Sequence, residues 1–250
     1  MACAWKYTRS LVFVVQMYLA MAVLGILFSP YAVLSRRGAF VACRAFCAWA
    51  LWTARWMVGI RTELRGEIPQ DEVMIASKHQ SFLDILIIFG TVPRPKFIMK
   101  RELMWTPFIG LYAKRLGCIP ITRGRGSETI AKMVKDVAEE FKDPGQLIIY
   151  PQGTRVEPGG YKTYKVGGAV LYEQLDQPCI PAATNVGLFW PKRGIIRHPG
   201  LAIVEFLPRI EPGLDKKAFM QRLETTIETR TNELLADAGF VQDEENRRPD

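Results

Sequence analysis

The first sixty residues of the chain contain no aspartate or glutamate, so every charged side chain in this segment is basic. Within it, the run from Leu11 to Phe28 has no charged residue at all. With a rise of 1.5 Å per residue, a helix over this run spans about 27 Å, which matches the hydrocarbon core of a bilayer. A secretory signal peptide has a shorter apolar core and a small-residue cleavage site. The longer run therefore predicts an uncleaved membrane anchor.

A second apolar stretch, Gly38 to Ile60, carries Arg44 and Arg55 on one edge of a helical wheel. Next to that edge lies a tryptophan stripe, which comprises Trp49, Trp52 and Trp56. Indole and guanidinium groups suit the membrane interface; the alternative is a core helix with its tryptophans packed inside the domain. In either case the two stretches fit a helical hairpin that dips into one leaflet. Leu11–Phe28 itself either crosses the bilayer or enters one leaflet only. The basic residues that follow favour a cytoplasmic location for the remaining chain.

Residues that bind metals or form disulfides are also scarce. The only histidines, His79 and His198, lie about 120 residues apart, which argues against a zinc site. The five cysteines are scattered and form no Cys-x-x-Cys pair, so they fit buried or lipid-facing apolar residues in a reducing compartment. No Gly-x-Ser-x-Gly elbow occurs, which counts against a serine esterase. We expect no metal and no bound cofactor.

The net charge of +8 fits nucleic acid, an anionic membrane or a phosphorylated substrate. The sequence contains no basic cluster interleaved with aromatic residues, no zinc finger and no RNP motif. Membrane lipid and phosphate are therefore the expected partners, and nucleic acid is not.

The segment from His79 to Asp84 follows an apolar run, Val73 to Ala76, that is typical of a buried strand. If the strand leads into a helix at this point, Asp84 lies in the first turn and can orient the imidazole. A histidine held in this way accepts a proton from a hydroxyl, while the carboxylate stabilises the imidazolium. A His and an Asp at this spacing are more often an accident of the surface, so the pair needs support from other motifs. His198 has no carboxylate at a useful spacing, and we interpret it as a loop residue.

After Gly66 and Pro69, short apolar runs alternate with amphipathic stretches, which predicts an α/β sandwich with a mixed sheet flanked by helices. The predicted strands are Val73–Ser77, Lys96–Met99, Cys118–Ile121, Leu147–Tyr150, Cys179–Thr184 and Leu201–Leu207. The predicted helices are Ser81–Phe89, Leu103–Leu116, Ser127–Phe141, Lys165–Leu175 and Asp215–Ala238. We divide the chain into anchoring helices over 1–62, a catalytic domain over 63–240 and a polar tail over 241–250.

Three further segments carry arginine, glycine or proline in or beside a predicted strand. Arg123 lies between a strand end and a glycine, and Tyr150-Pro151-Gln152-Gly153-Thr154-Arg155 forms a turn with a hydroxyl and an arginine. The planar guanidinium group donates two parallel hydrogen bonds to a phosphate, and a glycine lets a ligand approach the backbone. Taken singly, each arginine is more often a solvated surface charge. Pro181 interrupts a third strand, which is common at sheet edges.

In this order, the four motifs resemble the glycerophospholipid acyltransferase family, and in particular its bacterial lysophosphatidic acid acyltransferases. The resemblance covers residues ~70–210 and is far more specific than any single motif. It implies a general-base role for His79, with Asp84 as its orienting group. It also implies phosphate binding by Arg123, Gly153, Thr154 and Arg155, with Lys100 near the same phosphate. Ile180 and Pro181 would line the acyl-donor side.

The third motif departs from the family pattern, which usually reads Phe-Pro-Glu-Gly-Thr-Arg. This chain has Gln152 in place of the glutamate. A glutamate would support an arginine through an ion pair, whereas a glutamine offers only its carbonyl oxygen. A direct acid–base role at this position is therefore not expected, and the intact His79 and Asp84 argue that the chain is active.

The resemblance implies acyl transfer from acyl-CoA or acyl-carrier protein to the sn-2 hydroxyl of 1-acyl-sn-glycerol-3-phosphate, giving phosphatidic acid. It places the enzyme at the bacterial inner membrane with its catalytic domain on the cytoplasmic side. One alternative is another lysolipid acceptor, such as lyso-ornithine lipid, because the same base serves any hydroxyl. A second alternative is a membrane lipid-binding protein without catalysis, for which Gln152 is the only sequence evidence.

Overall fold

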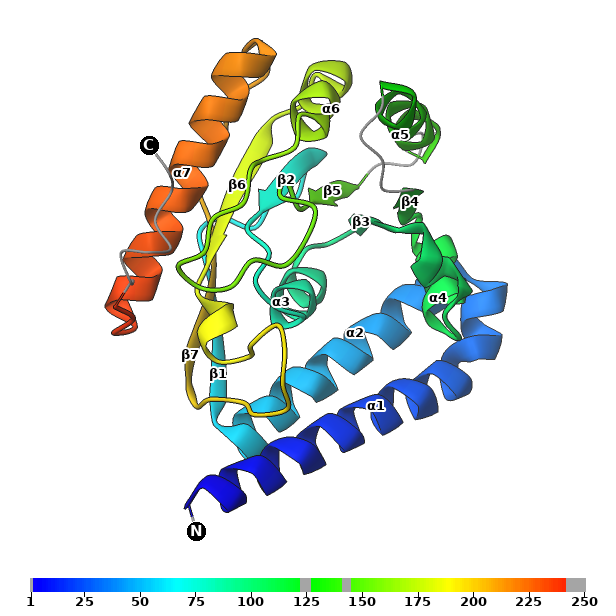
Figure 1. Cartoon of the computed structure of the whole chain (residues 1–250). Helices are drawn as coiled ribbons and strands as arrows, with labels where there is room; N and C mark the ends of the chain where they lie inside the picture. The colour runs from blue at the N-terminus through cyan, green and yellow to red at the C-terminus, as the bar shows by residue number, and fades with distance from the viewer. Residues whose placement is uncertain (1, 122–126, 141–144, 242–250) are drawn as a thin grey trace.

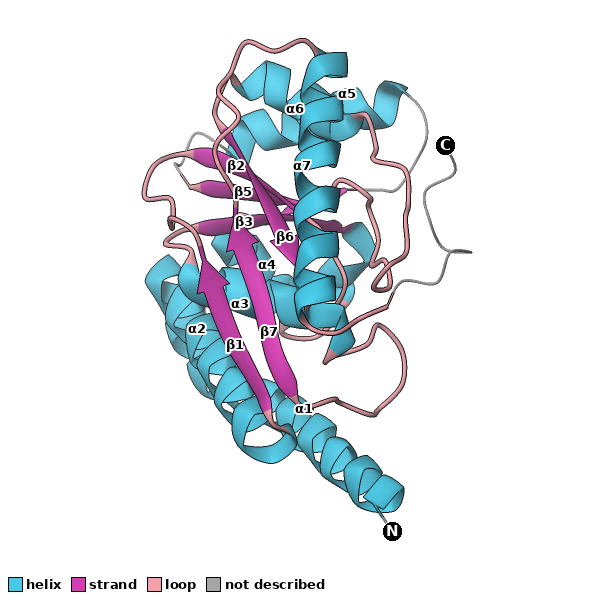
Figure 2. Cartoon of the chain, turned by 90° about the vertical axis from the view of Figure 1, so that its left-hand side faces the viewer, coloured by secondary structure: helices cyan, strands magenta, loops and turns pink. Residues whose placement is uncertain are grey.

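A computed structural model describes residues 2–121, 127–140 and 145–241. In this part of the chain, seven strands form one sheet in the order β1-β7-β6-β2-β5-β3-β4 (Figures 1 and 2). Their bounds are β1 Ile60–Arg65, β2 Val73–Ser77, β3 Pro95–Lys100, β4 Ile119–Ile121, β5 Gln146–Ile149, β6 Cys179–Thr184 and β7 Gly200–Phe206. Every neighbouring pair is parallel except β6 with β7, which is antiparallel. The predicted mixed sheet is therefore confirmed.

Helices cover both faces of the sheet, as Figure 1 shows. One face packs on α1 Ala2–Leu34, α2 Arg36–Thr53, α3 Leu83–Thr91 and α4 Ile109–Leu116. The other face packs on α5 Ser127–Glu140, α6 Gly167–Leu175 and α7 Lys216–Asp237. In β2 the residues alternate between the two cores, with Val73 and Ile75 on the first face and Met74 and Ala76 on the second. Since both faces are buried, the strand reads as a continuous apolar run.

Two elements differ from the sequence prediction. The helix predicted over Leu103–Leu116 is broken, because Arg101–Trp105 forms a 3-10 turn and α4 begins only at Ile109. Pro107 lies between them; it has no amide proton and forces the preceding Thr106 into an extended conformation, with ψ at 129°. Strand β1 was not predicted, because it follows the anchoring helices directly and carries alternating charged residues. It also crosses the predicted division between residues 62 and 63.

The two N-terminal helices form a hairpin that runs along one side of the domain (Figure 1). Ser35 caps α2, since its hydroxyl accepts a hydrogen bond from the amide of Arg37. Gly38 permits the close approach of α2 to the end of α1, because a Cβ at this position would lie 2.5 Å from backbone atoms of Tyr31. Within the described residues, Ala4–Leu34 is the one helix long and apolar enough to cross a membrane, and only 17% of its most apolar window is buried.

The tryptophan stripe faces outward. It extends from α2 into the π-helical turn Ala54–Val58 that follows this helix. Trp49, Trp52 and Trp56 are 43%, 58% and 71% exposed, and the last two stack with parallel rings. The opposite side of α2, which includes Ala39, Ala42 and Ala50, is buried against the domain. The alternative of a core helix with buried tryptophans is therefore wrong. Small residues make the contact with the domain, and the indoles form an apolar outer surface.

Candidate active site

The site lies at the carboxyl ends of the parallel strands, which end close to one another. Strands β2 to β6 run in the same direction, so the residues that follow them meet at their carboxyl ends. In open α/β sheets ligands usually bind at these ends. His79 follows β2, Lys100 ends β3 and Tyr150 follows β5. The predicted phosphate-binding residue after β4, Arg123, lies outside the described residues.

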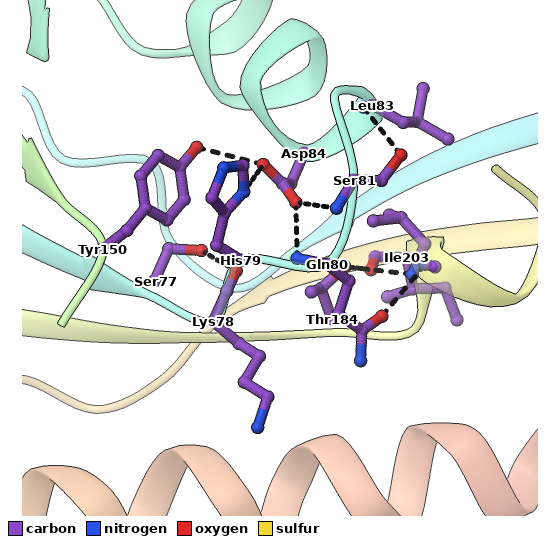
Figure 3. A network of polar contacts seen from close by, with 12 residues as sticks. Ser77, Lys78, His79, Gln80, Ser81, Leu83, Asp84, Tyr150, Thr184 and Ile203 are labelled. Carbon is purple, nitrogen blue, oxygen red and sulfur yellow. Dashed lines mark hydrogen bonds and ion pairs between the residues drawn. The ribbon is translucent and has the colours of Figure 1, made fainter. Parts of the chain in front are cut away.

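His79 and Asp84 form the predicted pair. Nδ1 of His79 lies 2.9 Å from Oδ1 of Asp84, whose side chain is fully buried, while that of His79 is 14% exposed (Figure 3). The backbone amides of Gln80 and Ser81 donate to the other carboxylate oxygen, at 3.0 and 2.9 Å. A carboxylate can only accept, so Nδ1 carries the proton and donates it. The lone pair of the neutral ring is then on Nε2, which can act as a base.

Tyr150 completes this arrangement, although we assigned it no role from the sequence. Its ring stacks on the imidazole of His79 with the centroids 3.9 Å apart, and its hydroxyl donates to Oδ1 of Asp84 at 3.1 Å (Figure 3). Burial and the neighbouring carboxylate both raise the pKa of Tyr150 well above its ordinary value, so the phenol remains a donor. The signal was present in the third motif, where the family usually has a phenylalanine that cannot make this bond.

The third motif wraps around His79. The amide of Val156 donates to the carbonyl of His79 at 2.8 Å, which places the backbone of the preceding Arg155 next to the His79 turn. Gly153 turns the chain here with a φ of +67°, a conformation that favours glycine, and a Cβ would meet the side chain of Lys165 at 2.8 Å. Thr154 lies in the same turn and is half-buried. The structure thus brings His79, Asp84, Gly153, Thr154 and Arg155 to one place.

Other predicted site residues lie further from the base. Lys100 is exposed at the end of β3 and forms an ion pair with Glu102 at 3.2 Å. Ile180 is buried within the core cluster that underlies α3, and it pairs with Ile75 in β2. Their roles toward the phosphate and the acyl donor stay predictions.

Pro181 does not lie in an edge strand, because β6 runs between β2 and β7. The edge interpretation is therefore wrong. The pairing of β6 with β7 covers only Ala182 to Thr184, so Pro181 faces the chain just beyond the end of β7. There its carbonyl accepts from the amide of Leu207. Having no amide proton, Pro181 cannot donate a hydrogen bond in return, and the paired ladder of β6 and β7 begins only at Ala182.

Gln152 lies in a buried polar network on the side of the turn facing α7. Its side-chain amide donates to the carbonyl of Lys162 at 2.9 Å and contacts Glu228 at 3.5 Å. The same carboxylate is 2.7 Å from the ammonium of Lys78 and accepts a hydrogen bond from the hydroxyl of Tyr164. Burial lowers the pKa of Lys78, and the charge of Glu228 opposes this change. Gln152 therefore contacts a carboxylate here, rather than the arginine that its position in the motif suggested.

A pocket of about 280 Å³ lies next to the turn that carries His79. One wall comes from Phe82, three residues after His79, and from Arg155. The pocket is also lined by Val14, Met17 and Tyr18 of α1, and by Trp190, Pro191, Lys192, Gly194, Ile195 and Arg197. The pocket therefore connects the His79 turn to the apolar N-terminal helix. Among the residues that the structure describes, no group of three or more His, Cys, Asp or Glu side chains could hold a metal ion.

Comparison with known proteins identifies the family. The model of the Acyltransferase family matches residues 59–185, about half of the chain. The chain is 30% identical over 199 residues to the 1-acyl-sn-glycerol-3-phosphate acyltransferase of Pseudomonas aeruginosa, covering 79% of this chain and 77% of that protein. It is 31% identical over 163 residues to the alpha form of the same enzyme from Mus musculus, covering 63% and 57% of the two chains.

A solved structure shares the fold. The crystal structure of the 1-acyl-sn-glycerophosphate (LPA) acyltransferase PlsC from Thermotoga maritima matches with a TM-score of 0.77 at 19% identity, covering 92% of this chain and 98% of that one. The chain belongs to the Acyltransferase family and is an acyltransferase enzyme. The predicted resemblance and the predicted α/β fold with flanking helices are both confirmed.

Proposed function

We propose that this acyltransferase moves an acyl group from a thioester, acyl-CoA or acyl-carrier protein, to the sn-2 hydroxyl of 1-acyl-sn-glycerol-3-phosphate. The product is phosphatidic acid. The observation that carries this proposal is the His79–Asp84 pair with Arg155 on the turn that hydrogen-bonds to His79. It supplies a base for a hydroxyl and, next to it, a cation for a phosphate. The names of the Pseudomonas and mouse relatives support the same acceptor.

The mechanism follows from the orientation of the imidazole. Nε2 of His79 takes the proton of the acceptor hydroxyl as the oxygen attacks the thioester carbonyl carbon. The resulting imidazolium is stabilised by the buried carboxylate of Asp84. When the tetrahedral intermediate collapses, the carbon–sulfur bond breaks and the departing thiolate takes the proton back from His79. A positioned base of this kind contributes about 10²–10⁴ in rate, and a phosphate held by Arg155 contributes orientation.

The reaction is proposed to take place at a membrane. Helix α1 is apolar and largely exposed, and the indoles of α2 extend the apolar surface. A lysolipid at this surface can reach the pocket, because residues of α1 form one of its walls. The basic residues that directly follow the second apolar stretch, Arg61 and Arg65, support a cytoplasmic location of the catalytic domain, which we assign to the bacterial inner membrane. The same basic pocket favours a phosphorylated acceptor over lyso-ornithine lipid.

Thiol release from oleoyl-CoA by the membrane fraction tests the proposal. We expect release that depends on 1-acyl-glycerol-3-phosphate, with phosphatidic acid as the lipid product. The same assay with oleoyl-acyl-carrier protein distinguishes the two donors. Release with a different lysolipid alone would keep the chemistry and change the acceptor. Failure with both donors would contradict the proposal and favour the lipid-binding alternative.

A further inference from the structure

We propose that Arg197 and Lys192 form, together with Arg155, a phosphate-binding subsite in the pocket beside His79. The subsite rests on the proposed function, because it would hold the phosphate group of one of the two substrates. All three side chains line the pocket. No aspartate or glutamate is among its lining residues in the part of the chain that the structure describes. A cluster of cations without a carboxylate is suited to an anion from outside.

Arg197 is the strongest evidence, because it is buried without an anionic partner. Its residue is 7% exposed, and its Nε is buried with no hydrogen-bond partner among the described residues. Nη1 donates to the carbonyls of Gly194 and Ile196, at 3.0 and 3.2 Å. Neutral carbonyls compensate poorly for the lost hydration of a guanidinium. Burial lowers the pKa of Arg197 to about 10, which still leaves it charged at neutral pH.

The surroundings hold this guanidinium in place. It lies over the ring of Trp190, 4.7 Å from the centroid, and its backbone amide donates to the hydroxyl of Ser10 in α1 at 3.0 Å. Preorganised donors of this kind bind an anion without a large ordering cost. The local charge is positive as well. Burial, Lys6 and Arg197 all lower the pKa of the neighbouring His198, whose Nδ1 contacts the ammonium of Lys6 at 3.0 Å.

The subsite is connected to the catalytic base through the walls of the pocket. Phe82, from the His79 turn, packs edge-on against Trp190, with centroids 6.1 Å apart. Arg155 contributes from the other side, next to the hydrogen bond between Val156 and His79. Apolar side chains of α1, Val14 and Met17, line the same pocket as the cations. This combination fits the phosphoester of an amphipathic substrate, which is present both in a lysolipid headgroup and in the CoA or phosphopantetheine part of the donor.

Steady-state kinetics with two variants test the subsite. Arg197→Met removes the charge but keeps length and packing against Trp190; Lys192→Ala removes the second cation. Arg193→Met is the matched control, since Arg193 is an exposed arginine of the same loop and does not line the pocket. We expect Arg197→Met to raise the KM for one phosphorylated substrate about tenfold or more, because hydrogen bonds to charged groups are strong. Lys192→Ala should raise it about threefold, and the control should leave it unchanged.

The substrate whose KM rises identifies the source of the phosphate. A rise for lysophosphatidate places the lipid headgroup in the subsite. A rise for acyl-CoA, absent with an acyl-N-acetylcysteamine thioester that has no phosphate, places the donor there. Unchanged KM values for both substrates in a folded Arg197→Met protein would overturn the proposal. If Arg197→Met does not fold, the same comparison with Lys192→Ala decides.

A binding measurement separates the subsite from the proposed function. The melting temperature of the detergent-solubilised wild type is measured with lysophosphatidate, with CoA and with monoacylglycerol, which has no phosphate. We expect lysophosphatidate or CoA to raise it in the wild type and the control, and to raise it much less in Arg197→Met. This readout needs no turnover, so it stands even if the wild type transfers no acyl group to lysophosphatidate. Equal shifts in the wild type and in Arg197→Met would contradict the subsite.

Discussion

On one side of the His79 turn every oxygen of Asp84 is occupied by hydrogen bonds, whereas on the other side Arg197 is buried with an unpaired Nε. On the side of Asp84, which we call the closed side, the hydrogen bonds fix the tautomer of the imidazole. No hydrogen bond from a substrate is needed to complete this arrangement. On the side of Arg197, which we call the open side, the positive charge of the guanidinium is not neutralised by a carboxylate of the described residues. The two proposed roles follow this contrast, with proton transfer assigned to the side of Asp84 and anion binding to the side of Arg197.

Replacing Asp84 breaks the closed side, and only the loss of His79 itself should reduce activity more. In Asp84→Asn, the side chain has one acceptor oxygen instead of two, so it cannot accept all the hydrogen bonds that the two carboxylate oxygens of Asp84 accept. An amide NH₂ group then faces either the imidazole or the two backbone amides. We expect acyl transfer to fall about 10²–10⁴-fold with little change in KM. Activity is measured beside circular dichroism, and a folded variant with more than about a tenth of wild-type activity would contradict the role of Asp84.

The second prediction concerns the buried polar network of Gln152, Lys78 and Glu228, which lies on the side of the third motif that faces α7. Gln152→Glu restores the usual family residue, but it places a second carboxylate about 3.5 Å from Glu228, where Lys78 is already paired. We expect a loss of about 1–3 kcal/mol in the free energy of unfolding. The repulsion raises the pKa of the introduced carboxyl. The penalty should therefore be small near about pH 5 and full near about pH 8.

The double variant Gln152→Glu/Glu228→Gln is the matched control for that prediction. It leaves one carboxylate next to Lys78, so most of the lost stability should return. Melting temperatures of the wild type, of Gln152→Glu, of Glu228→Gln and of the double variant in detergent provide the measurement. A Gln152→Glu protein as stable as the wild type at both pH values would show that the two side chains do not interact.

Removing the hydroxyl of Tyr150 should have the smallest effect. Tyr150→Phe keeps the ring that stacks on His79 and removes one of the hydrogen bonds to Asp84. We expect a loss of a few-fold in kcat. Because the raised pKa keeps the phenol protonated, the activity ratio of wild type to variant should stay constant from about pH 7 to about pH 10. A ratio that falls toward one in this range would mean that the phenol titrates.

The parts of the site that were predictable from the sequence are those that depend on local spacing. His79 and Asp84 are five positions apart, so a strand followed by a helix suffices to bring them together. Likewise, apolar runs with clear ends predicted β2 and β6 with their observed bounds. Strand β1, with its charged residues, gave no such pattern, and a single proline ended the helix predicted from Leu103.

The remaining parts depend on contacts between distant segments. Lys78 and Glu228 are 150 positions apart, and Ser10 and Arg197 are 187 apart. No periodicity or motif connects such residues, because the packing of α7 and α1 on the domain determines which side chains meet. The unpaired Nε of Arg197 is visible only once burial and partners are known. Sequence reasoning thus paired His79 with Asp84, and it missed the contact of Tyr150 with this pair and the burial of Arg197.

The most direct test of the account compares the wild type with His79→Ala in phosphatidic acid formation from oleoyl-CoA and lysophosphatidate. Both proteins are first matched by melting temperature and by binding of lysophosphatidate. If His79 is the base, the variant binds the lipid as the wild type does and forms product about 10²–10⁴-fold more slowly. A folded His79→Ala protein with near-normal product formation would contradict the central claim.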